Sequence, residues 1–349
     1  MNPNRVLIVI LSYNGADYLG DCLSSLKNVN YPKDQLEVLL IDNASTDNSV
    51  QYLKNNWPEL KLIVAEKNLG FAAGNNIGFQ YAIENNFDYV YLLNQDTVVT
   101  ADFLQPVVEL ANTNPWIGAV KSKLLLHQDK EKINSIGNEI HYLGFAFAGG
   151  YLLADTQLTN KEITYPSGAC TLFRVSALKD VGLFNPEFFM YHEDADLGWR
   201  FWLGGYKVML APDSVVYHKY EFSRSIKKYY YMERNRYLIL LQNYKMATLL
   251  LILPAACLMD IAMFLYSFFA GWSKEEFAVY GYFFKPQSWE KILKVRKTIQ
   301  KNRRVRDREI IQKFVCKIEF QEIQNPLLKY IANPIFNCYW QVVKRIIWW

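Results

Sequence analysis

Short, uniformly apolar runs alternate with segments of helical periodicity through the first 122 residues of this 349-residue chain. Residues 6–11 form such a run, and residues 18–26 then place four apolar side chains at helical spacing. Strands that are apolar throughout are typical of a parallel sheet covered on both faces, and their alternation with helices is typical of doubly wound proteins. The pattern therefore predicts an α/β fold with a doubly wound, mainly parallel sheet. We expect strands at 6–11, 38–41, 60–65, 89–93 and 117–120, and helices at 18–26, 49–53, 71–83 and 101–111, with Pro106 kinking or delaying the last helix.

The chain changes character after residue 122. Residues 123–220 are less regular and hold the densest acidic cluster, and residues 247–272 are almost entirely apolar. Residues 285–313 carry 11 Lys or Arg against 3 Asp or Glu. We therefore expect one α/β domain over 1–240, with halves 1–122 and 123–240, followed by a helical, basic region over 241–349.

Composition excludes several classes of protein. An apolar content of 51% and a charged content of 21% exclude general disorder. A formal net charge of +4 is too mild to predict a nucleic-acid partner. The five cysteines are scattered without a CxxC pair, which predicts neither a zinc site nor a disulfide framework and favours a reducing compartment. The first apolar run is too short for a secretory signal, so we expect none.

Polar residues follow each of the first four predicted strands. The loops begin at Ser12, Asp42, Glu66 and Asn94, and three of the four contain an acidic residue. Ordinary turn chemistry explains any one of these loops. The carboxyl ends of parallel strands share one edge of a sheet, where ligands of such folds bind, so four polar loops together predict a binding site there.

Five motifs in a fixed order, ILSYNG, IDNASTDNS, NLGFAAGNNIGF, LLNQDT and MYHEDADLGWR, resemble those of the inverting family 2 glycosyltransferases, most nearly the bacterial rhamnosyltransferase-like members. The resemblance covers about residues 5–240. It implies the GT-A fold of nucleotide-diphospho-sugar transferases, and transfer of a sugar from such a donor to a hydroxyl of a lipid-linked glycan in cell-surface polysaccharide synthesis. It favours dTDP-L-rhamnose as the donor, or otherwise a UDP-sugar.

A donor diphosphate requires a divalent cation, Mg²⁺ or Mn²⁺, and such ions prefer carboxylate oxygens. Asp96 is the best single candidate ligand, and it resembles the last residue of the family's DxD motif, in which Asn94 here replaces the first Asp. A helix cap near Thr97 is the alternative role for Asp96. By the same resemblance His218 is a second metal candidate, and a packing role is its alternative.

The predicted donor-binding residues lie mostly in the same loops. Asp42 can accept a hydrogen bond from a pyrimidine ring or a ribose hydroxyl, although an Asx turn would use the same carboxylate. By resemblance, Tyr13 and Asn14 line the base pocket, with packing as the alternative role of Tyr13. Arg224, with the two lysines that follow it, can close over the diphosphate, and a solvated face or contact with lipid phosphates is the alternative. The remaining members of the predicted set are Ser12, Asn68, Gly74, Asn94 and Gln95.

The acidic run 192–196 holds the predicted general base. Asp194 and Asp196 are about 200° apart around a helix, so both cannot face one cleft. Asp196 and Arg200 have the spacing of an ordinary helix ion pair, which leaves Asp194 for the cleft, with Glu193 as a hydrogen-bonding neighbour. A position in the first helical turn favours an ionised carboxylate, as a base requires. The resemblance assigns the family's base to Asp194 as well, although an acid-rich helix start needs no catalytic role.

The apolar run 247–272 is long enough to cross a bilayer. A single crossing would put the basic stretch 285–313 on the far side from a cytosolic catalytic domain, against the positive-inside rule. We therefore expect a helix, or a broken helical pair, lying in the cytoplasmic leaflet with the basic residues on anionic headgroups, as in a peripheral or monotopic protein. A helical hairpin buried in a soluble oligomer is the alternative. Two rival functions are a non-catalytic membrane-bound sugar-binding scaffold and a sugar-phosphate nucleotidyltransferase, although residues 6–14 lack the Gly-rich basic loop typical of the latter.

Overall fold

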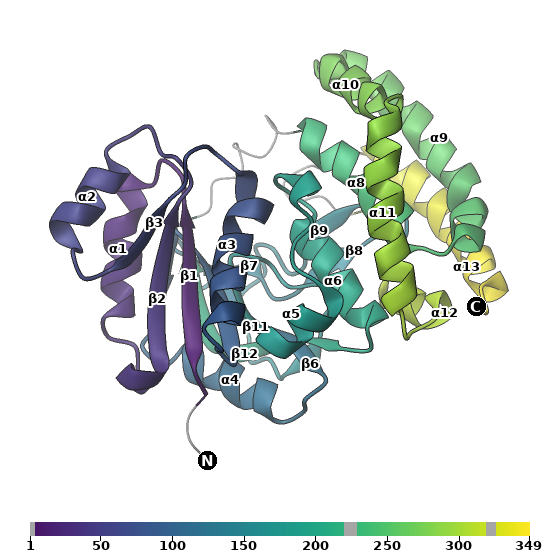
Figure 1. Ribbon diagram of the computed structural model, residues 1–349. Helices are drawn as coiled ribbons and strands as arrows, with labels where there is room; N and C mark the ends of the chain where they lie inside the picture. The colour runs from purple at the N-terminus through teal and green to yellow at the C-terminus, as the bar shows by residue number, and fades with distance from the viewer. Residues whose placement is uncertain (1–3, 220–228, 319–325) are drawn as a thin grey trace. The chain divides into compact units, whose positions relative to one another are not determined.

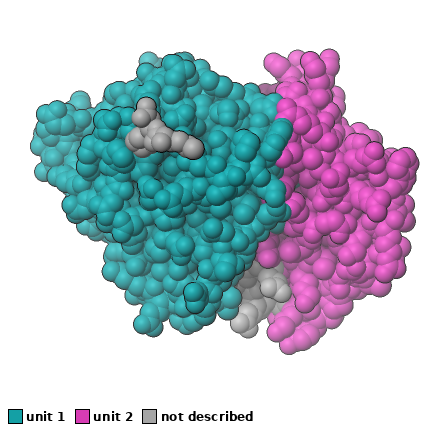
Figure 2. Space-filling model, turned by 90° about the horizontal axis from the view of Figure 1, so that it is seen from below, with its two compact units in different colours: residues 1–138, 148–201, 206–221 teal, residues 139–147, 202–205, 222–349 magenta. Residues whose placement is uncertain are grey.

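The fold is that of a computed structural model, and the structure describes residues 4–219, 229–318 and 326–349. The chain divides into two compact units (Figure 2). Unit 1 comprises residues 1–138, 148–201 and 206–221, and unit 2 comprises residues 139–147, 202–205 and 222–349. Each unit is described by itself below.

Unit 1 is built on a mixed sheet in the order β10-β12-β6-β11-β4-β1-β2-β3 (Figure 1). In addition, β5 pairs with β12 and β7 pairs with β6. Four strands, β3, β2, β1 and β4, are parallel, and β12 runs parallel to β6. Strand β11 lies antiparallel between β4 and β6. The strands are β1 Val6–Ser12, β2 Leu36–Asp42, β3 Lys61–Val64, β4 Tyr89–Asn94, β5 Thr97–Val99, β6 Ile117–Leu126, β7 Ile133–Ser135, β10 Lys161–Glu162, β11 Cys170–Arg174 and β12 Lys207–His218. A two-stranded hairpin, β8 Asn138–Ile140 and β9 Ala146–Ala148, is separate from this sheet.

Helices cover both faces of the sheet, as the apolar strands require. The apolar residues of α1 and α4 pack with β1 and β4 into one core. On the other face, α3 approaches β1 so closely that a Cβ on Gly78 would lie 2.4 Å from a methyl carbon of Val9. The helices of this unit are α1 Ala16–Leu26, α2 Ser49–Asn56, α3 Gly70–Glu84, α4 Leu104–Asn112, α5 Val175–Val181 and α6 Glu193–Leu203.

The predicted doubly wound, mainly parallel sheet is confirmed, with differences at particular elements. Helix α4 begins at Leu104, three residues after the expected start, so that Pro106 occupies the first turn, where its missing N–H costs no helical hydrogen bond. Strand β6 continues to Leu126, beyond the predicted residue 120. The antiparallel strand β11 was not predicted.

Unit 2 is largely helical. Its helices are α8 Tyr229–Asn243, α9 Met246–Ala270, α10 Ser273–Phe283, α11 Pro286–Asn302, α12 Asp307–Ile310 and α13 Asn333–Ile346. The sequence predicted a domain boundary after residue 240, whereas α8 belongs to the second unit because it packs against α10 and α11. Helix α9 is continuous from Met246 to Ala270 with Pro254 inside it, so the apolar run forms the single helix of the two expected arrangements rather than the broken pair. Within the described residues, α9 is the one helix whose length and composition suit a membrane crossing, and only 22% of its most apolar window is buried.

Candidate active site

The loops after β1 and β2 are tied to each other at the carboxyl edge of the sheet. Asn14 has a left-handed backbone conformation (φ 49°), its N–H donates to Ser45 Oγ at 2.9 Å, and its side-chain oxygen accepts from the N–H of Thr46 at 2.8 Å. The buried carboxylate of Asp42 accepts from the N–H and the hydroxyl of Ser45, at 2.9 and 2.6 Å. The Asx-turn role is therefore the one that the structure gives Asp42, and its contact with a nucleotide stays a prediction.

Gln95 holds the first loop from the other side. Its side-chain oxygen accepts from the N–H of Tyr13 at 3.0 Å, and its amide nitrogen donates to the Tyr13 carbonyl at 3.2 Å. Both ends of the amide thus help to position the loop, and contact of Gln95 with the donor stays a prediction. The ring of Tyr13 is 42% exposed, so this side chain does not serve core packing. Ser12 is fully buried, and its hydroxyl has no hydrogen-bond partner within the described residues.

The turn before α3 is shaped by two asparagines. Asn68 Oδ1 accepts from the N–H of Gly70 at 2.8 Å and from the side chain of Asn43 at 3.1 Å. Gly74 was predicted in the donor-binding set, but a Cβ at this position would meet a methyl group of Leu11 at 2.6 Å. Its place is thus the close packing of α3 on β1, since two glycines one turn apart let the helix backbone approach the strand.

Asp96 and His218, the two predicted metal ligands, lie side by side. His218 Nε2 is 3.3 Å from Asp96 Oδ1, and His218 Nδ1 is 3.0 Å from the side-chain oxygen of Asn134. An amide oxygen can only accept, so Nδ1 is the donor to Asn134 and Nε2 is the atom that faces the carboxylate. A proton on Nε2 or a metal ion between these two atoms would stabilise them at this distance, and a histidine fixed by a second partner is typical of metal sites. Thr97 lies in strand β5, so the helix-cap role of Asp96 is excluded.

These two ligands fit a divalent ion that completes its coordination with phosphate oxygens. Across residues 4–219, 229–318 and 326–349, no group of three or more acidic, His or Cys side chains could hold a metal by itself. Asp96 and His218 alone would leave an open set of ligands, and their role as metal ligands stays a prediction. Arg224 and the lysines at 227 and 228, predicted to close over the diphosphate, lie outside the described residues.

Asp194 reaches the same edge of the sheet through the segment that precedes β11. Its Oδ2 accepts from the N–H of Gly168 at 3.4 Å, and its Oδ1 accepts from the N–H of Ala195 at 2.8 Å. The next residue, Ala169, accepts through its carbonyl from the N–H of Asn94 at 3.0 Å. One short segment thus connects the predicted base to the loop that carries Asp96.

Burial raises the pKa of Asp194 to about 6, against the lowering effects of the Ala195 and Gly168 N–H groups and of the buried Lys121 ammonium. The helix dipole predicts a lowered pKa for this carboxylate, but desolvation outweighs the dipole and raises the pKa. Burial and the adjacent Asp194 also raise the pKa of Glu193 well above its ordinary range. Glu193 is 6% exposed, and its Oε2 has no hydrogen-bond partner in the part of the chain that the structure describes. Asp194 is therefore the member of the pair that carries the charge near neutral pH.

Lys121 is the site residue that the sequence analysis missed. Its side chain is fully buried and donates to the carbonyls of Ser122 and Ser135, at 3.0 and 2.8 Å, and burial lowers its pKa. Charged side chains are rarely buried without partners. A lysine directly after the apolar residues of a predicted strand was the available signal.

Asp196 has the structural role that its spacing predicted. It is fully buried and pairs with Arg200 at 2.8 Å, and Arg200 also donates to three carbonyls in the turn after α5. This network fixes the start of α6. The segment before α6 is strained, because Phe189, Tyr191 and His192 have φ values of 62°, 66° and 67°, a conformation that non-glycine residues avoid.

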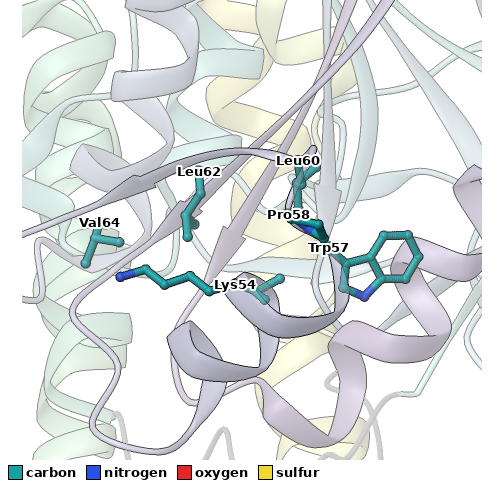
Figure 3. A pocket seen from close by; sticks show the side chains of 7 residues that line it. Lys54, Trp57, Pro58, Leu60, Leu62 and Val64 are labelled. Carbon is teal, nitrogen blue, oxygen red and sulfur yellow. The ribbon is translucent and has the colours of Figure 1, made fainter.

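A hollow of unit 1 lies between α2 and β3 and reaches the carboxyl edge of the sheet at Val64, the register partner of Asp42. Leu53, Lys54 and Trp57 of the α2 region line it with Leu60, Leu62 and Val64 of the β3 region (Figure 3). None of the predicted catalytic, donor-binding or metal residues borders it, and its single ionisable side chain offers no acid–base pair. This hollow is therefore not the candidate active site.

Comparison with known proteins agrees with this geometry. The family model described as glycosyl transferase family 2 matches residues 7–182, about half of the chain. The chain is 29% identical over 215 residues to the poly-beta-1,6-N-acetyl-D-glucosamine synthase of Staphylococcus epidermidis and 28% identical over 211 residues to that of Staphylococcus aureus. These matches cover 61% and 59% of this chain, and they span about half of the relatives, 49% and 48%.

Solved structures share the fold at lower identity. GalNAc-T7 with UDP, GalNAc and Mn²⁺ aligns with a TM-score of 0.56 and 17% identity over 69% of this chain and 48% of that one. Staphylococcus aureus TarS aligns with a TM-score of 0.51 and 17% identity over 98% of this chain and 55% of that one. These likenesses support the predicted GT-A fold.

Proposed function

This chain belongs to glycosyl transferase family 2, and from that premise we propose that it is an inverting, metal-dependent enzyme in which Asp194 is the general base. One observation carries the proposal: a buried carboxylate with a pKa of about 6 is joined, through residues 168 and 169, to the loop that bears Asp96. A general base works best when its pKa lies near the operating pH.

The reaction we propose is a single displacement. Asp194 accepts the proton of the acceptor hydroxyl, the oxygen forms its bond to the anomeric carbon, and the bond from that carbon to the diphosphate breaks on the opposite face. The nucleoside diphosphate leaves with the electron pair, and the anomeric configuration inverts. Among the described residues, no second carboxylate beside Asp194 suits a covalent intermediate, since burial raises the pKa of Glu193 well above its ordinary range and Asp196 is bound to Arg200.

Asp96 and His218 would hold Mg²⁺ or Mn²⁺. Such an ion, when bound, neutralises the negative charge that develops on the leaving diphosphate. Two contacts support the binding of an ion by these residues. His218 Nε2 faces Asp96 Oδ1, and Asn134 fixes the imidazole ring. GalNAc-T7, which shares the fold, was solved with Mn²⁺.

Two donor classes remain from the sequence, dTDP-L-rhamnose and UDP-sugars. Similar proteins favour UDP-sugars, because two relatives are poly-N-acetylglucosamine synthases and GalNAc-T7 was solved with UDP and GalNAc. We propose a hydroxyl of a lipid-linked glycan as the acceptor, in polysaccharide synthesis at the cytoplasmic face of the cell membrane. The apolar helix α9 in the same chain supports this location.

The test is release of nucleoside diphosphate from a panel of dTDP- and UDP-sugars, with Mg²⁺, Mn²⁺ or EDTA. We expect turnover of at least one donor that EDTA abolishes, and an Asp194→Asn variant that is slower by about 10²–10⁴-fold. Asp34→Asn is the matched control, because Asp34 is exposed before β2, at the opposite edge of the sheet. Equal turnover in Asp194→Asn and wild type would favour the rival proposal of a non-catalytic sugar-binding scaffold.

A further inference from the structure

One long face of helix α9 lies at the surface of unit 2. Every exposed side chain on this face of α9 is uncharged. Leu250 at one end is 63% exposed and Phe269 at the other end is 89% exposed. Exposed apolar residues on a soluble protein are normally scattered singly, and a continuous patch indicates a binding surface. The other exposed large apolar residues of this face are Leu253, Leu258, Ile261, Leu265, Tyr266 and Phe268.

The opposite face of α9 is attached to unit 2 along its length. Near its start, Thr248 donates to Asp307 at 2.5 Å, and the N–H of Lys245 donates to the same carboxylate at 2.9 Å. In the middle, Asp260, the one charged residue of α9, pairs with the fully buried Arg236 of α8 at 2.6 Å. Further on, the Phe264 ring contacts aromatic rings of α10. A helix crossing a bilayer would have to break these contacts or bring the Asp260–Arg236 pair into hydrocarbon, which is costly.

Helix α13 extends the uncharged surface. The hydroxyl of Tyr339 donates to the carbonyl of Leu251 at 2.6 Å, which places α13 beside α9 (Figure 1). Ile335, Val342 and Ile346 are half-exposed and lie at spacings of seven and four residues, so they form one stripe on α13 next to Tyr339. We call the exposed apolar residues of α9 together with this stripe the α9–α13 face.

The charge of the two units indicates what covers this face. Unit 2 contains 22 Lys or Arg against 10 Asp or Glu, whereas unit 1 contains 16 against 24. A bilayer with anionic lipids provides both interactions, because its headgroups attract a basic unit and its acyl chains bury an apolar face. A second copy docked on the same face would bring two strongly basic units together, and their repulsion disfavours that occupant.

We propose that the α9–α13 face lies in one leaflet of an anionic bilayer, with α9 parallel to the membrane plane and pinned there by the Asp260–Arg236 pair. The protein is then monotopic: both ends of α9 stay at the same depth, and the basic residues of unit 2 meet the headgroups. This inference deepens the proposed location and needs no assumption about the transfer reaction.

The first experiment is flotation of the full-length protein with two kinds of vesicle. One is pure phosphatidylcholine, and the other contains about one-third anionic phosphatidylglycerol. We expect binding to the anionic vesicles that weakens at high salt, and a loss of at least about tenfold in Leu258→Glu/Ile261→Glu. The control is Leu293→Glu on α11, which replaces a side chain of similar exposure, 55%, outside the face and should bind like wild type. Absence of vesicle binding at low salt would overturn the proposal, as would a dimer that the double variant converts to monomer.

The second experiment distinguishes a helix α9 that lies in one leaflet from a helix α9 that crosses the bilayer. Cys257 and Cys338 are exposed natural cysteines on α9 and α13, so each can carry an environment-sensitive fluorophore in a variant that lacks the other. Single cysteines introduced at Leu250 and Phe269 report the two ends of α9. We expect shallow quenching at both ends by lipids added to the outer leaflet alone. Quenching of only one end from that leaflet would show a crossing helix. Donor turnover measured without vesicles in the same variants separates failure of this inference from failure of the proposed reaction.

Discussion

The charge state of the two adjacent carboxyls at the start of α6 can be tested through the pH dependence of catalysis. Asp194 has a pKa of about 6, while the pKa of Glu193 lies well above its ordinary range. The difference has a structural cause, because Asp194 accepts from two backbone N–H groups and Glu193 Oε2 has no partner within the described residues. Among the described residues, Lys121 on β6 and Asp196 on α6 also act on this pair.

A pKa of about 6 leaves about nine-tenths of Asp194 ionised at pH 7 and about one-tenth at pH 5. Since only the ionised form accepts a proton, kcat/KM should rise with pH and level off above about 7, falling about tenfold per pH unit well below 6. Glu193→Gln replaces a neutral acid by a neutral amide of the same shape. We therefore expect this variant to keep kcat/KM within about threefold of wild type and to keep the acidic limb in place, whereas Asp194→Asn loses about 10²–10⁴-fold.

The assay is initial-rate release of nucleoside diphosphate between pH 5 and 8.5 at constant ionic strength, with thermal unfolding at each pH to separate inactivation from titration. A limb that moves downward by a full pH unit in Glu193→Gln would mean that Glu193 carries a charge in the wild-type enzyme, and the assignment would be refuted. An unchanged limb in Asp194→Asn would refute the role of Asp194 itself.

Three further outcomes follow from the contacts in unit 1. His218→Asn removes one of the two proposed metal ligands, and the Mn²⁺ concentration for half-maximal turnover should rise by about 10–100-fold, whereas an unchanged requirement would place the ion elsewhere. Gly78→Ala puts a methyl group against Val9, and chemical denaturation should show a loss of about 1–3 kcal/mol, while no loss would mean that α3 can move away from β1. Arg200→Met removes the ion pair of the buried Asp196, and we expect a loss of about 3–5 kcal/mol by the same measurement, with partial recovery in the double variant Arg200→Met/Asp196→Leu, which does not restore the hydrogen bonds to three carbonyls.

The sequence predicted those parts of the fold that depend on local pattern. Helices cover both faces of strand β1, and the uninterrupted apolar run of residues 6–11 predicts this burial. The pairing of Asp196 with Arg200 is likewise a property of helical spacing. The meeting of Asp96 with His218 was reached through a family resemblance, since 122 residues separate them in the chain and no local pattern joins them.

Other features depend on contacts between distant segments, which a local pattern does not contain. Strand β11 is five residues long and ends in a charged side chain, so its place between β4 and β6 has no periodic signal. Gly74 stands near a polar loop in sequence, but the helix that contains it turns the residue onto Leu11. Lys121 is stabilised by a carbonyl of β7, and this partner is visible only when the two strands are adjacent.

The reversed direction of β11 has a consequence for how such an enzyme can change over evolutionary time. Because β11 runs against its neighbours, its beginning rather than its end reaches the ligand edge, and a main-chain N–H just before β11 donates to Asp194, the proposed general base. Only proline removes a main-chain donor, although at Gly168 itself an added Cβ would meet the Phe71 ring at 2.9 Å. Replacements at the residues beside Gly168 therefore leave the donor to Asp194 in place, and the preference for a sugar or an acceptor can change over time while this hydrogen bond is kept.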